Sequence, residues 1–238
     1  MSEPTNRIVM LSGATKGIGE AIAARLYQDG YRLSLGARNP NALAKVLRDD
    51  RERVLTVPYD ATGGTAAARN WVDATVKHFG TFDTLINNAG MQIRSGFEES
   101  TEAELMDILT VNAMAPYLLS QAAWPHLKAA GHGKVVNIIS LSGVRVKPTT
   151  STLYAVSKHA AMALSHSLRA LGWKHGIRVT AILPGAVATP MTLDKTDVAH
   201  DLMMAPETIA GLVAHVLTLP QNASVSMLPV SPVVEQLY

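Results

Sequence analysis

Two residues near the middle of the chain have the types and the spacing of a proton-transfer pair. Tyr154 and Lys158 lie four positions apart, and residues at that spacing share one face of a helix, so both side chains can reach one cavity. A free tyrosine has a pKa of about 10, and a neighbouring ammonium would lower that pKa by stabilising the phenolate. We therefore expect Tyr154 to act as a general acid and base, although an isolated pair of this kind could also be a surface feature of an amphipathic helix.

A glycine-rich loop near the start of the chain is the second candidate for chemistry. It reads Ser12-Gly13-Ala14-Thr15-Lys16-Gly17-Ile18-Gly19. Backbone N–H groups at a helix N-terminus can bind a pyrophosphate, and glycines let the chain approach the phosphates closely. Taken alone, the same glycines could form an ordinary turn between a strand and a helix, so the assignment depends on the motifs that follow.

An alternating α/β chain would position these residues. Short β-type runs alternate with longer helical patterns, which is typical of βαβ units on a parallel sheet. We predict strands at 7–11, 32–35, 53–59, 84–86, 134–139, 178–183 and 224–230, and helices at 18–29, 41–49, 64–79, 101–130, 153–173 and 206–219. The longest helix should bend near Asn112 and Pro116, because proline removes a helical hydrogen bond. The predicted fold class is α/β, a Rossmann-type doubly wound parallel sheet of about seven strands with helices on both faces, in a single domain over residues 1–238.

Four motifs, in this order and at close to these spacings, resemble those of the short-chain dehydrogenase/reductase family. They are the G-x-x-x-G-x-G loop at 13–19, Asn87-Asn88-Ala89-Gly90, Tyr154-Ala-Val-Ser-Lys158 and Pro184-Gly185-Ala-Val187-Ala-Thr189. The resemblance covers the chain from Ile8 to about Thr189. It implies hydride transfer between a nicotinamide cofactor and a carbonyl/alcohol pair, with Tyr154 in proton transfer and Lys158 also hydrogen bonded to the nicotinamide ribose.

Two more catalytic residues follow from the same resemblance. Ser140 begins Ser140-Leu-Ser-Gly143, which resembles the family's S-x-x-G, and it follows a strand at its C-terminal end, where a hydroxyl can stabilise a carbonyl oxygen. Ser140 lies fourteen residues before Tyr154, one more than the commonest family spacing, and Ser142 lies twelve before it, so Ser142 is the competing assignment. We prefer Ser140 because the loop at 144–152 can absorb one residue. The resemblance makes Asn112 the fourth catalytic residue, which kinks its helix and holds a water leading to the lysine.

The end of the second predicted strand indicates which cofactor the chain prefers. NAD-selective relatives tend to place a carboxylate there for the ribose 2′-OH, and this strand ends at Leu35-Gly36-Ala37-Arg38 without one. Arg38 can pair with a 2′-phosphate through its fork of donors. Lys16 in the glycine loop adds a second cation, so NADP(H) is favoured over NAD(H).

The resemblance also implies which residues bind this cofactor. Asp60 and Ala61, after the third strand, would contact the adenine, and Val187 and Thr189 would contact the carboxamide end of the nicotinamide. The complete predicted set is Gly13, Thr15, Lys16, Gly17, Ile18, Gly19, Arg38, Asp60, Ala61, Asn88, Ala89, Gly90, Tyr154, Lys158, Pro184, Gly185, Val187 and Thr189.

The composition argues against several other classes of protein. Of 238 residues, 47% are hydrophobic and 17% charged, and the net charge of +2 gives no reason to expect a nucleic acid or a membrane as partner. Zero cysteines exclude disulfides, thiol catalysis and Cys-ligated metals. The eight histidines show no metal-binding spacing, and no G-x-S-x-G motif or Walker A lysine occurs. No apolar run approaches the roughly 18 residues of a membrane helix. We expect no metal and a soluble, cytoplasmic protein.

The remaining expectations concern substrate and assembly. The segment at about 188–205 and the loop at 144–152 should set the specificity for a small carbonyl or alcohol, whose identity the sequence leaves open. Met191, Met203 and Met204 either line an apolar substrate pocket or pack in the core. The resemblance implies a homodimer or homotetramer formed by the helices at 101–130 and 153–173. The main alternative is a non-catalytic NADP(H)-binding regulator on the same fold, which would be expected to lack Tyr154 or Lys158.

Overall fold

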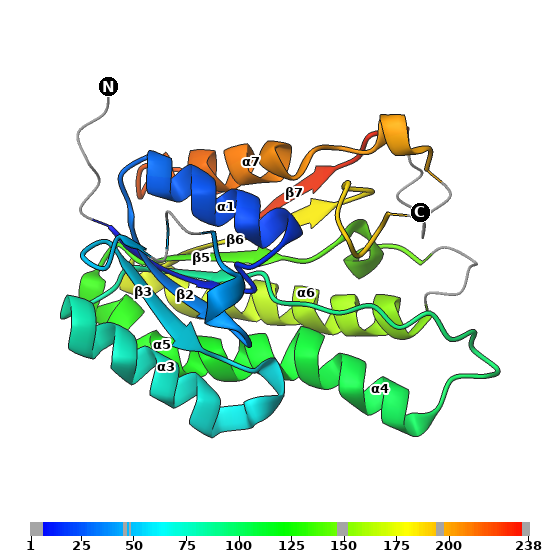
Figure 1. The fold of residues 1–238 in the computed structure, drawn as a ribbon, viewed down its shortest axis with the longest axis horizontal. Helices are drawn as coiled ribbons and strands as arrows, with labels where there is room; N and C mark the ends of the chain where they lie inside the picture. The colour runs from blue at the N-terminus through cyan, green and yellow to red at the C-terminus, as the bar shows by residue number, and fades with distance from the viewer. Residues whose placement is uncertain (1–6, 45–46, 48, 147–151, 194–197, 235–238) are drawn as a thin grey trace.

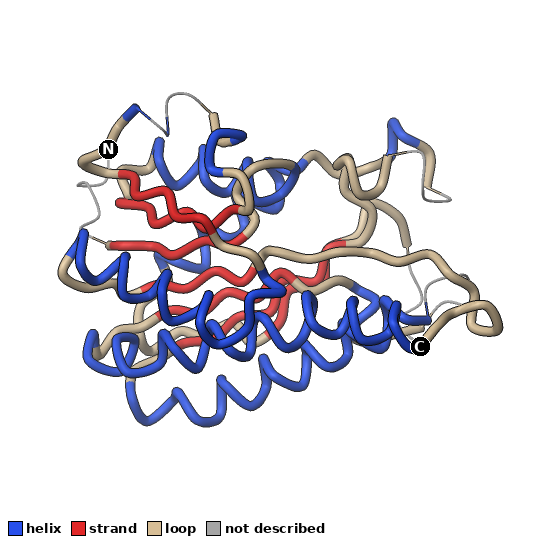
Figure 2. The backbone as a smooth tube through the Cα atoms, turned by 60° about the horizontal axis from the view of Figure 1, so that its bottom comes forward, coloured by secondary structure: helices blue, strands red, loops and turns tan. Residues whose placement is uncertain are grey.

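The chain forms a seven-stranded parallel sheet with helices on both faces, as the sequence predicts (Figure 1, Figure 2). This computed structural model describes residues 7–44, 47, 49–146, 152–193 and 198–234. The strands are β1 (Ile8–Ser12), β2 (Arg32–Ala37), β3 (Val54–Pro58), β4 (Thr84–Asn87), β5 (Lys134–Ile138), β6 (Arg178–Pro184) and β7 (Met227–Val230). Their spatial order is β3-β2-β1-β4-β5-β6-β7, and every neighbouring pair is parallel. The order reverses between β1 and β4, and this is the position at which doubly wound sheets bind their ligands.

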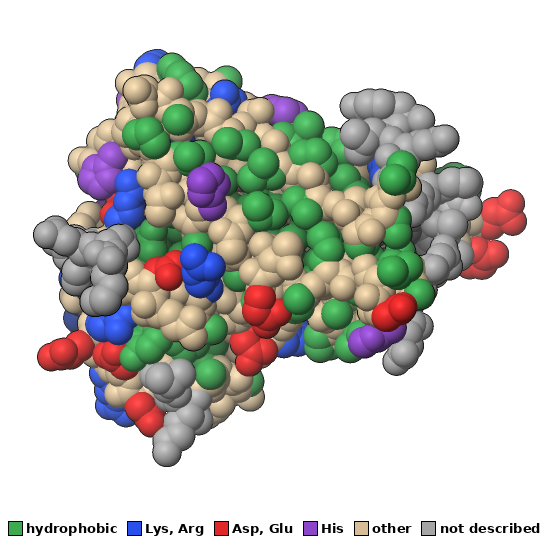
Figure 3. Space-filling view, turned by 90° about the horizontal axis from the view of Figure 1, so that it is seen from above, with side chains coloured by type: hydrophobic (Ala, Val, Ile, Leu, Met, Phe, Trp, Pro, Cys, Tyr) green, Lys and Arg blue, Asp and Glu red, His purple; other side chains and the backbone are tan. Residues whose placement is uncertain are grey.

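Helices cover the two faces of the sheet as separate layers (Figure 1). They are α1 (Gly17–Gln28), α3 (Gly64–Phe79), α4 (Glu102–Leu109), α5 (Ala115–Ala130), α6 (Thr152–Gly172) and α7 (Pro206–Thr218). The α1 and α7 helices lie on one face, and α3, α5 and α6 lie on the other. Seen from the side of α1 and α7, hydrophobic side chains gather over the middle of this face (Figure 3).

The central strand β1 shows why these segments form a sheet. All five of its residues are buried, and a near-continuous apolar run is typical of a parallel strand covered on both faces. Val9 and Leu11 pack in the cluster beneath α1 and α7, whereas Ile8 and Met10 pack in the cluster beneath α3 and α5. The period of two thus divides one strand between two cores.

The predicted helix at 101–130 is interrupted where its bend was expected. It begins at Thr101 with a capping box in which the Thr101 and Glu104 side chains bind each other's backbone N–H groups. A π-helical segment, Thr110–Met114, separates α4 from α5, and Pro116 lies in the first turn of α5. Proline is tolerated there, and π-helical turns inside α-helices are frequent at functional sites.

Several predicted bounds differ from those in the structure. β2 extends to Ala37, so Arg38 follows the strand directly, and β7 is shorter than the predicted 224–230. The predicted helix at 41–49 begins with a 3₁₀ turn, Pro40–Ala42, and Lys45, Val46 and Arg48 lie outside the described residues. Within the predicted substrate segment at 188–205, Met204 forms an isolated bridge with Val187, which precedes the segment, and residues 194–197 lie outside the described part.

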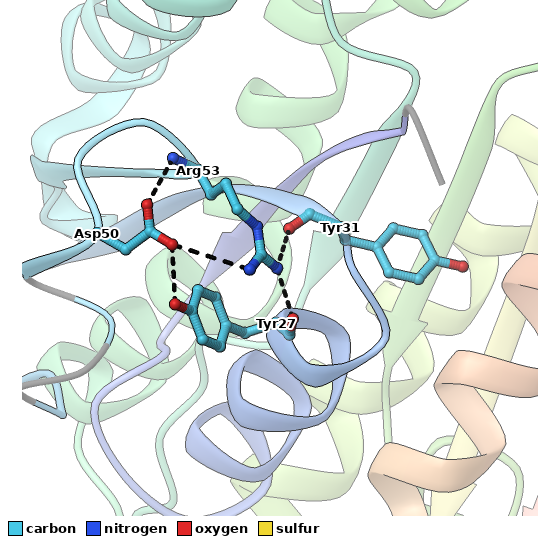
Figure 4. Close-up of polar contacts among 4 residues, drawn as sticks. All are labelled: Tyr27, Tyr31, Asp50 and Arg53. Atoms are coloured by element: carbon cyan, nitrogen blue, oxygen red, sulfur yellow. Dashed lines mark hydrogen bonds and ion pairs between the residues drawn. The ribbon is translucent and has the colours of Figure 1, made fainter. Parts of the chain in front are cut away.

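A polar cluster joins α1 to the start of β3 (Figure 4). The Arg53 Nη2 donates to the backbone oxygens of Tyr27, at 2.6 Å, and Tyr31, at 3.4 Å. The Tyr27 hydroxyl donates to Asp50 at 2.8 Å, and the Arg53 guanidinium lies over the Tyr27 ring, 4.2 Å from its centroid. These contacts lie near the amino ends of β2 and β3, away from the carboxyl ends, and they fix the chain where it leaves α1.

Among the described helices, none combines the length with the apolar character that crossing a membrane requires.

Candidate active site

A cavity of about 730 Å³ opens at the carboxyl ends of the parallel strands. Its volume is within the range of small-molecule sites. Ser140 and every residue predicted to bind the cofactor line it: Gly13, Thr15, Lys16, Gly17, Ile18, Gly19, Arg38, Asp60, Ala61, Asn88, Ala89, Gly90, Tyr154, Lys158, Pro184, Gly185, Val187 and Thr189. The strands therefore bring together residues that are spread over most of the sequence.

The glycine loop and the N-N-A-G turn form one end of this cavity and are bonded to each other. Gly13 has a φ of +72°, which favours glycine. A Cβ on Gly19 would lie 2.0 Å from the Gly13 oxygen and 2.4 Å from Asn88 Nδ2, so only glycine fits there. Asn88 Nδ2 donates to the backbone oxygens of Ser12 and Gly13, each at 3.0 Å. The loop and the turn thus form one cradle with its backbone close to the cavity.

Ser12 is a residue of this cradle that the sequence analysis did not single out. Its hydroxyl oxygen accepts from the backbone N–H groups of Asn88, at 3.0 Å, and Ala89, at 3.1 Å. The same hydroxyl donates to the Ile86 oxygen at 3.4 Å. Its position directly after the first predicted strand and directly before the glycines was the available signal.

The end of the cavity beyond β2 and β3 carries both predicted cations and one acid. Arg38 follows β2, Lys16 precedes α1, and Asp60 follows β3. The Thr62 backbone N–H and hydroxyl each donate to Asp60 at 2.9 Å. These hydrogen bonds, and then the positive charge of Arg38, hold the pKa of Asp60 below its usual value.

Tyr154, Lys158 and Ser140 meet at the far wall of the cavity. Tyr154 and Lys158 lie one turn apart in α6, and the Lys158 Nζ lies 5.5 Å from the centroid of the Tyr154 ring. Ser140 lines the same cavity wall, close enough to Tyr154 to lower the pKa of the tyrosine hydroxyl. Ser142 instead donates its backbone N–H to the Ser140 hydroxyl at 3.1 Å. Of the two competing serines, the fold brings Ser140 to the tyrosine.

The pKa of Tyr154 differs from the sequence-based expectation. We expected the pKa to be lowered, and this expectation was wrong, because burial raises the pKa of Tyr154 to about 12 and the neighbouring Ser140 side chain offsets only part of the rise. Burial also lowers the pKa of Lys158 to about 8. The physical reason is burial, which disfavours the charged form of both groups.

Asn112 lies behind this wall rather than in the large cavity. It is buried in the π-helical segment, where its Oδ1 accepts from the Met91 N–H at 2.8 Å. Its Nδ2 donates to the Met91 oxygen at 2.9 Å and to the Ser157 hydroxyl at 3.0 Å. The side chain therefore joins the segment after the N-N-A-G turn to α6. Asn112 and Lys158 both line a second, much smaller cavity.

The large cavity includes further residues that the motifs did not indicate. Met91 directly follows the N-N-A-G turn, and Asp107 and Val111 lie one turn apart near the junction of α4 and the π-helical segment. Of the three methionines with two predicted roles, Met191 lines the cavity, whereas Met204 packs against the hydrophobic core. Sequence alone could not separate these two roles, because both need an apolar side chain.

Known proteins are similar in sequence to this chain over most of its length. The profile of a family described as short chain dehydrogenase matches residues 7–199. An agropine synthesis reductase of Rhizobium rhizogenes is 36% identical over 220 residues, which make up 92% of this chain and 50% of that protein. The chain thus spans about half the length of this relative. An uncharacterized oxidoreductase of Staphylococcus epidermidis is 30% identical over 238 residues, covering 98% of this chain and 100% of that protein.

A solved structure of a dehydrogenase is also similar to this chain over nearly its whole length. An alcohol dehydrogenase from the archaeon Thermococcus sibiricus, complexed with 5-hydroxy-NADP, has a TM-score of 0.87 to this chain at 27% identity. The match covers 98% of this chain and 99% of that one. Because the family profile extends from β1 to beyond β6 and the four motifs occur at one cavity, the chain belongs to the short chain dehydrogenase family.

Proposed function

We propose that this chain, an oxidoreductase by its family, interconverts a carbonyl compound and a secondary alcohol with NADP(H), using Tyr154 as the general acid and base. The observation that carries the proposal is that Ser140, Tyr154 and the buried Lys158 line the wall of one cavity, whose other end is the glycine cradle. A proton donor and a dinucleotide cradle in one cavity are the two parts that such a reaction requires.

The residues of the cavity fit a dinucleotide. The cradle leaves no room for a Cβ at Gly19, so the backbone of the loop can approach a pyrophosphate at the start of α1. Arg38 and Lys16 supply positive charge where a 2′-phosphate would lie, and β2 ends without a carboxylate. Asp60 and Ala61 would hold the adenine, and Val187 and Thr189 the nicotinamide end. The Thermococcus sibiricus relative, complexed with 5-hydroxy-NADP, is in keeping with this preference.

The nicotinamide would supply or accept the hydride, and the residues of this chain would handle the proton. Ser140 would donate a hydrogen bond to the carbonyl oxygen and so stabilise the negative charge that develops on it. The raised pKa of Tyr154 keeps its hydroxyl protonated at neutral pH, ready to donate to that oxygen during reduction. The Lys158 ammonium, over the ring of Tyr154, would stabilise the phenolate that remains.

Tyr154→Phe tests the proposal directly. We expect purified wild-type protein to oxidise NADPH with at least one member of a panel of ketones, aldehydes and keto acids. The variant should lose about two to four orders of magnitude in kcat, because proton transfer from a positioned side chain contributes that much. The rate is measured from the loss of NADPH absorbance.

Tyr117→Phe is the matched control, since Tyr117 is an exposed tyrosine of α5 that does not line the cavity within the described residues. It should retain the wild-type rate. If Tyr154→Phe also turned over at that rate, the assigned acid would be wrong. If NADPH bound but no compound was reduced, the non-catalytic alternative would be favoured.

A further inference from the structure

A buried tryptophan lies beneath the end of the large cavity that Arg38 and Asp60 line. Trp71 belongs to α3, is 0% exposed and falls outside all four motifs. Two residues that its ring contacts, Gly36 and Tyr59, line the cavity, whereas the indole is not among the described residues that line it. The indole therefore supports this end of the cavity from the side of the protein core.

A closed set of hydrogen bonds fixes the position of the indole. Trp71 Nε1 donates to the Ser34 hydroxyl at 2.9 Å, and the Thr75 hydroxyl donates to the Trp71 backbone oxygen at 2.8 Å. A hydroxyl has one hydrogen to donate, so Ser34 is the donor in the 2.7 Å contact between the two hydroxyls. All three residues are 0% exposed. Because a fully satisfied buried network specifies one arrangement of its members, the indole has one orientation.

The six-membered ring of this indole fills the space that a side chain at Gly36 would need. A Cβ on Gly36 would lie 2.6–2.8 Å from three carbon atoms of the ring. Gly36 is paired with Ser12 of β1 and with Val57 of β3, so it lies inside the sheet. Glycine weakens the interior of a strand and often marks a place where another group approaches closely. Here the close group is the indole, which contacts the backbone of β2.

This part of the β2 backbone connects two regions of the cavity. The Gly36 oxygen accepts from the Gly13 N–H at 3.0 Å, and this bond joins β2 to the glycine loop. The Ala37 oxygen accepts from the Tyr59 N–H at 3.0 Å, and Arg38 follows directly. A displacement of Gly36 would therefore change the position of Arg38 relative to the glycine loop.

The indole also supports the end of β3. The ring centroids of Tyr59 and Trp71 are 4.7 Å apart, and their planes form an angle of 42°. This separation is in the range of stabilising aromatic pairs. Tyr59 is 6% exposed and directly precedes Asp60. One buried ring thus contacts both segments that carry the charged residues of this end, Arg38 after β2 and Asp60 after β3.

We propose that Trp71 is a positioning residue that sets the distance between Arg38 and the glycine loop and so makes the cavity selective for a 2′-phosphate. It acts through Gly36 and Tyr59 and touches neither cofactor nor substrate. The proposal rests on the NADP(H) preference of the proposed function. A binding group has to be held within about 0.5 Å of its productive position, and paired hydrogen bonds from a guanidinium to a phosphate depend on geometry. NADH lacks the 2′-phosphate, so its binding is insensitive to this distance.

Trp71→Phe tests the positioning role. Phenylalanine keeps an aromatic ring, but this ring is too short to fill the space under Gly36 and has no N–H to donate to Ser34. The Kd values of NADPH and NADH are measured separately from the fluorescence of the nicotinamide, which does not depend on the tryptophans. We expect the Kd of NADPH to rise by about fivefold, part of what loss of a charge-assisted hydrogen bond would cause, and the Kd of NADH to change by less than about twofold.

Trp124→Phe is the matched control. Trp124 of α5 packs against the same hydrophobic cluster as Trp71, and a Cβ on Gly172 would lie 3.2 Å from its ring. It is not among the described residues that line the cavity. This variant should have a lower thermal midpoint, and both of its Kd values should remain those of the wild type.

A second pair of variants tests the contact between the indole and Gly36. In Gly36→Ala the new Cβ would lie 2.6 Å from the ring, so the end of β2 must move. We expect this variant to bind NADPH more weakly than the wild type and NADH almost unchanged. Adding Trp71→Phe makes room for the Cβ, so the double variant should bind NADPH more tightly than Gly36→Ala alone.

The ratio of the two Kd values separates the possible outcomes. If Trp71→Phe lowered the thermal midpoint but kept the wild-type ratio, or if both Kd values rose equally, Trp71 would be a core residue only and the positioning role would be refuted. If the wild type bound NADH as tightly as NADPH, the cofactor preference of the proposed function would fail instead. If Trp71→Phe does not fold, Ser34→Ala, which removes the hydrogen bond of the indole but keeps its ring, should shift the same ratio in the same direction.

Discussion

Arg38 is the residue at which the sequence argument about the cofactor can be tested most simply. It follows β2 directly, lines the large cavity and is close enough to Asp60 to lower the pKa of that carboxyl. A 2′-phosphate would pair with its guanidinium, whereas a free 2′-OH would gain much less from it.

Arg38→Ala should therefore raise the Kd of NADPH by about tenfold or more and change the Kd of NADH by less than about threefold. Both constants are measured by fluorescence titration. Arg69→Ala, which removes the same charge from an exposed position on α3, is the control and should change neither Kd. Equal losses for the two cofactors, or tighter NADH binding by the wild type, would contradict the preference for NADP(H).

Gly19 tests the cradle itself. In Gly19→Ala the new Cβ would have to lie 2.0 Å from the Gly13 oxygen, so the loop must move. We expect a loss of about 1–3 kcal/mol in the free energy of unfolding, as for other overpacked sites, and much weaker NADPH binding. Gly211→Ala in α7 is the control, because its nearest neighbour is 3.8 Å away. Gly19→Ala with wild-type stability and affinity would show that the close approach is wrong.

At the scale of elements, the polar cluster of Tyr27, Asp50 and Arg53 (Figure 4) makes a prediction about stability that is separate from function. Arg53→Ala removes the donors to the Tyr27 and Tyr31 oxygens. Because Arg53 is partly exposed, we expect a loss of only about 1 kcal/mol in the free energy of unfolding.

Urea denaturation measures this loss, and the Kd of NADPH should not change. Arg51→Ala is the matched control, since Arg51 is an exposed arginine two residues away. If both variants were equally stable, the cluster would contribute nothing measurable to joining α1 to β3.

The elements also show how far sequence patterns reach. The predicted helix at 64–79 is α3, which ends where Gly80 adopts a φ of +79°, a local signal that the sequence contains. The interruption of the helix at 101–130 was indicated by Asn112 and Pro116. Its π-helical form, however, coincides with contacts from Asn112 to Met91 and Ser157, which no pattern within the helix encodes.

The candidate site also has one part that the sequence predicts and another part that it does not. Motif order and the rule that ligands bind at strand carboxyl ends were enough to select a set of residues that all line one cavity. The choice between Ser140 and Ser142, and the pKa of Tyr154, were not accessible in this way. Both depend on burial and on which hydroxyl a turn directs at the tyrosine, and these are properties of packing rather than of spacing.

For the whole molecule, the buried ionisable groups predict how stability varies at alkaline pH. Burial lowers the pKa of Lys134 and of Lys158 to about 8. Between that pH and about 10.4, the unfolded chain binds more protons than the folded one, so the free energy of unfolding should rise with pH. Burial raises the pKa of Tyr59 and Tyr154 to about 12. Above about pH 10 the folded state therefore binds more protons, and its stability should fall.

Urea denaturation from pH 7 to 11 measures this profile, and Lys134→Met serves as the informative variant. Lys134 is buried and donates to the Leu219 oxygen at 2.7 Å, far from the cavity. Without its ammonium, the rise between pH 8 and 10 should become smaller. A wild-type profile that fell steadily from pH 8 would contradict the assigned burial of both lysines.

Assembly is also a property of the whole molecule. The helices predicted to form a homodimer or homotetramer expose apolar side chains, namely Met106, Met114, Tyr117, Val156 and Leu171. Such side chains suit an interface between copies of the chain. The oligomer stays a prediction, which light scattering of the purified protein would decide.

The hydroxyl of Ser12 connects the glycine loop, at one end of the cavity, with the backbone beside Lys158 at the other. It fastens the end of β1 to the backbone of Asn88 and Ala89, and the next residue, Gly90, approaches the Lys158 ammonium so closely that a Cβ there would lie 3.5 Å from it. A shift in the position of the glycine loop should therefore also shift the backbone beside Lys158. The glycine loop and the backbone beside Lys158 are thus coupled through the hydrogen bonds of both Ser12 and Asn88.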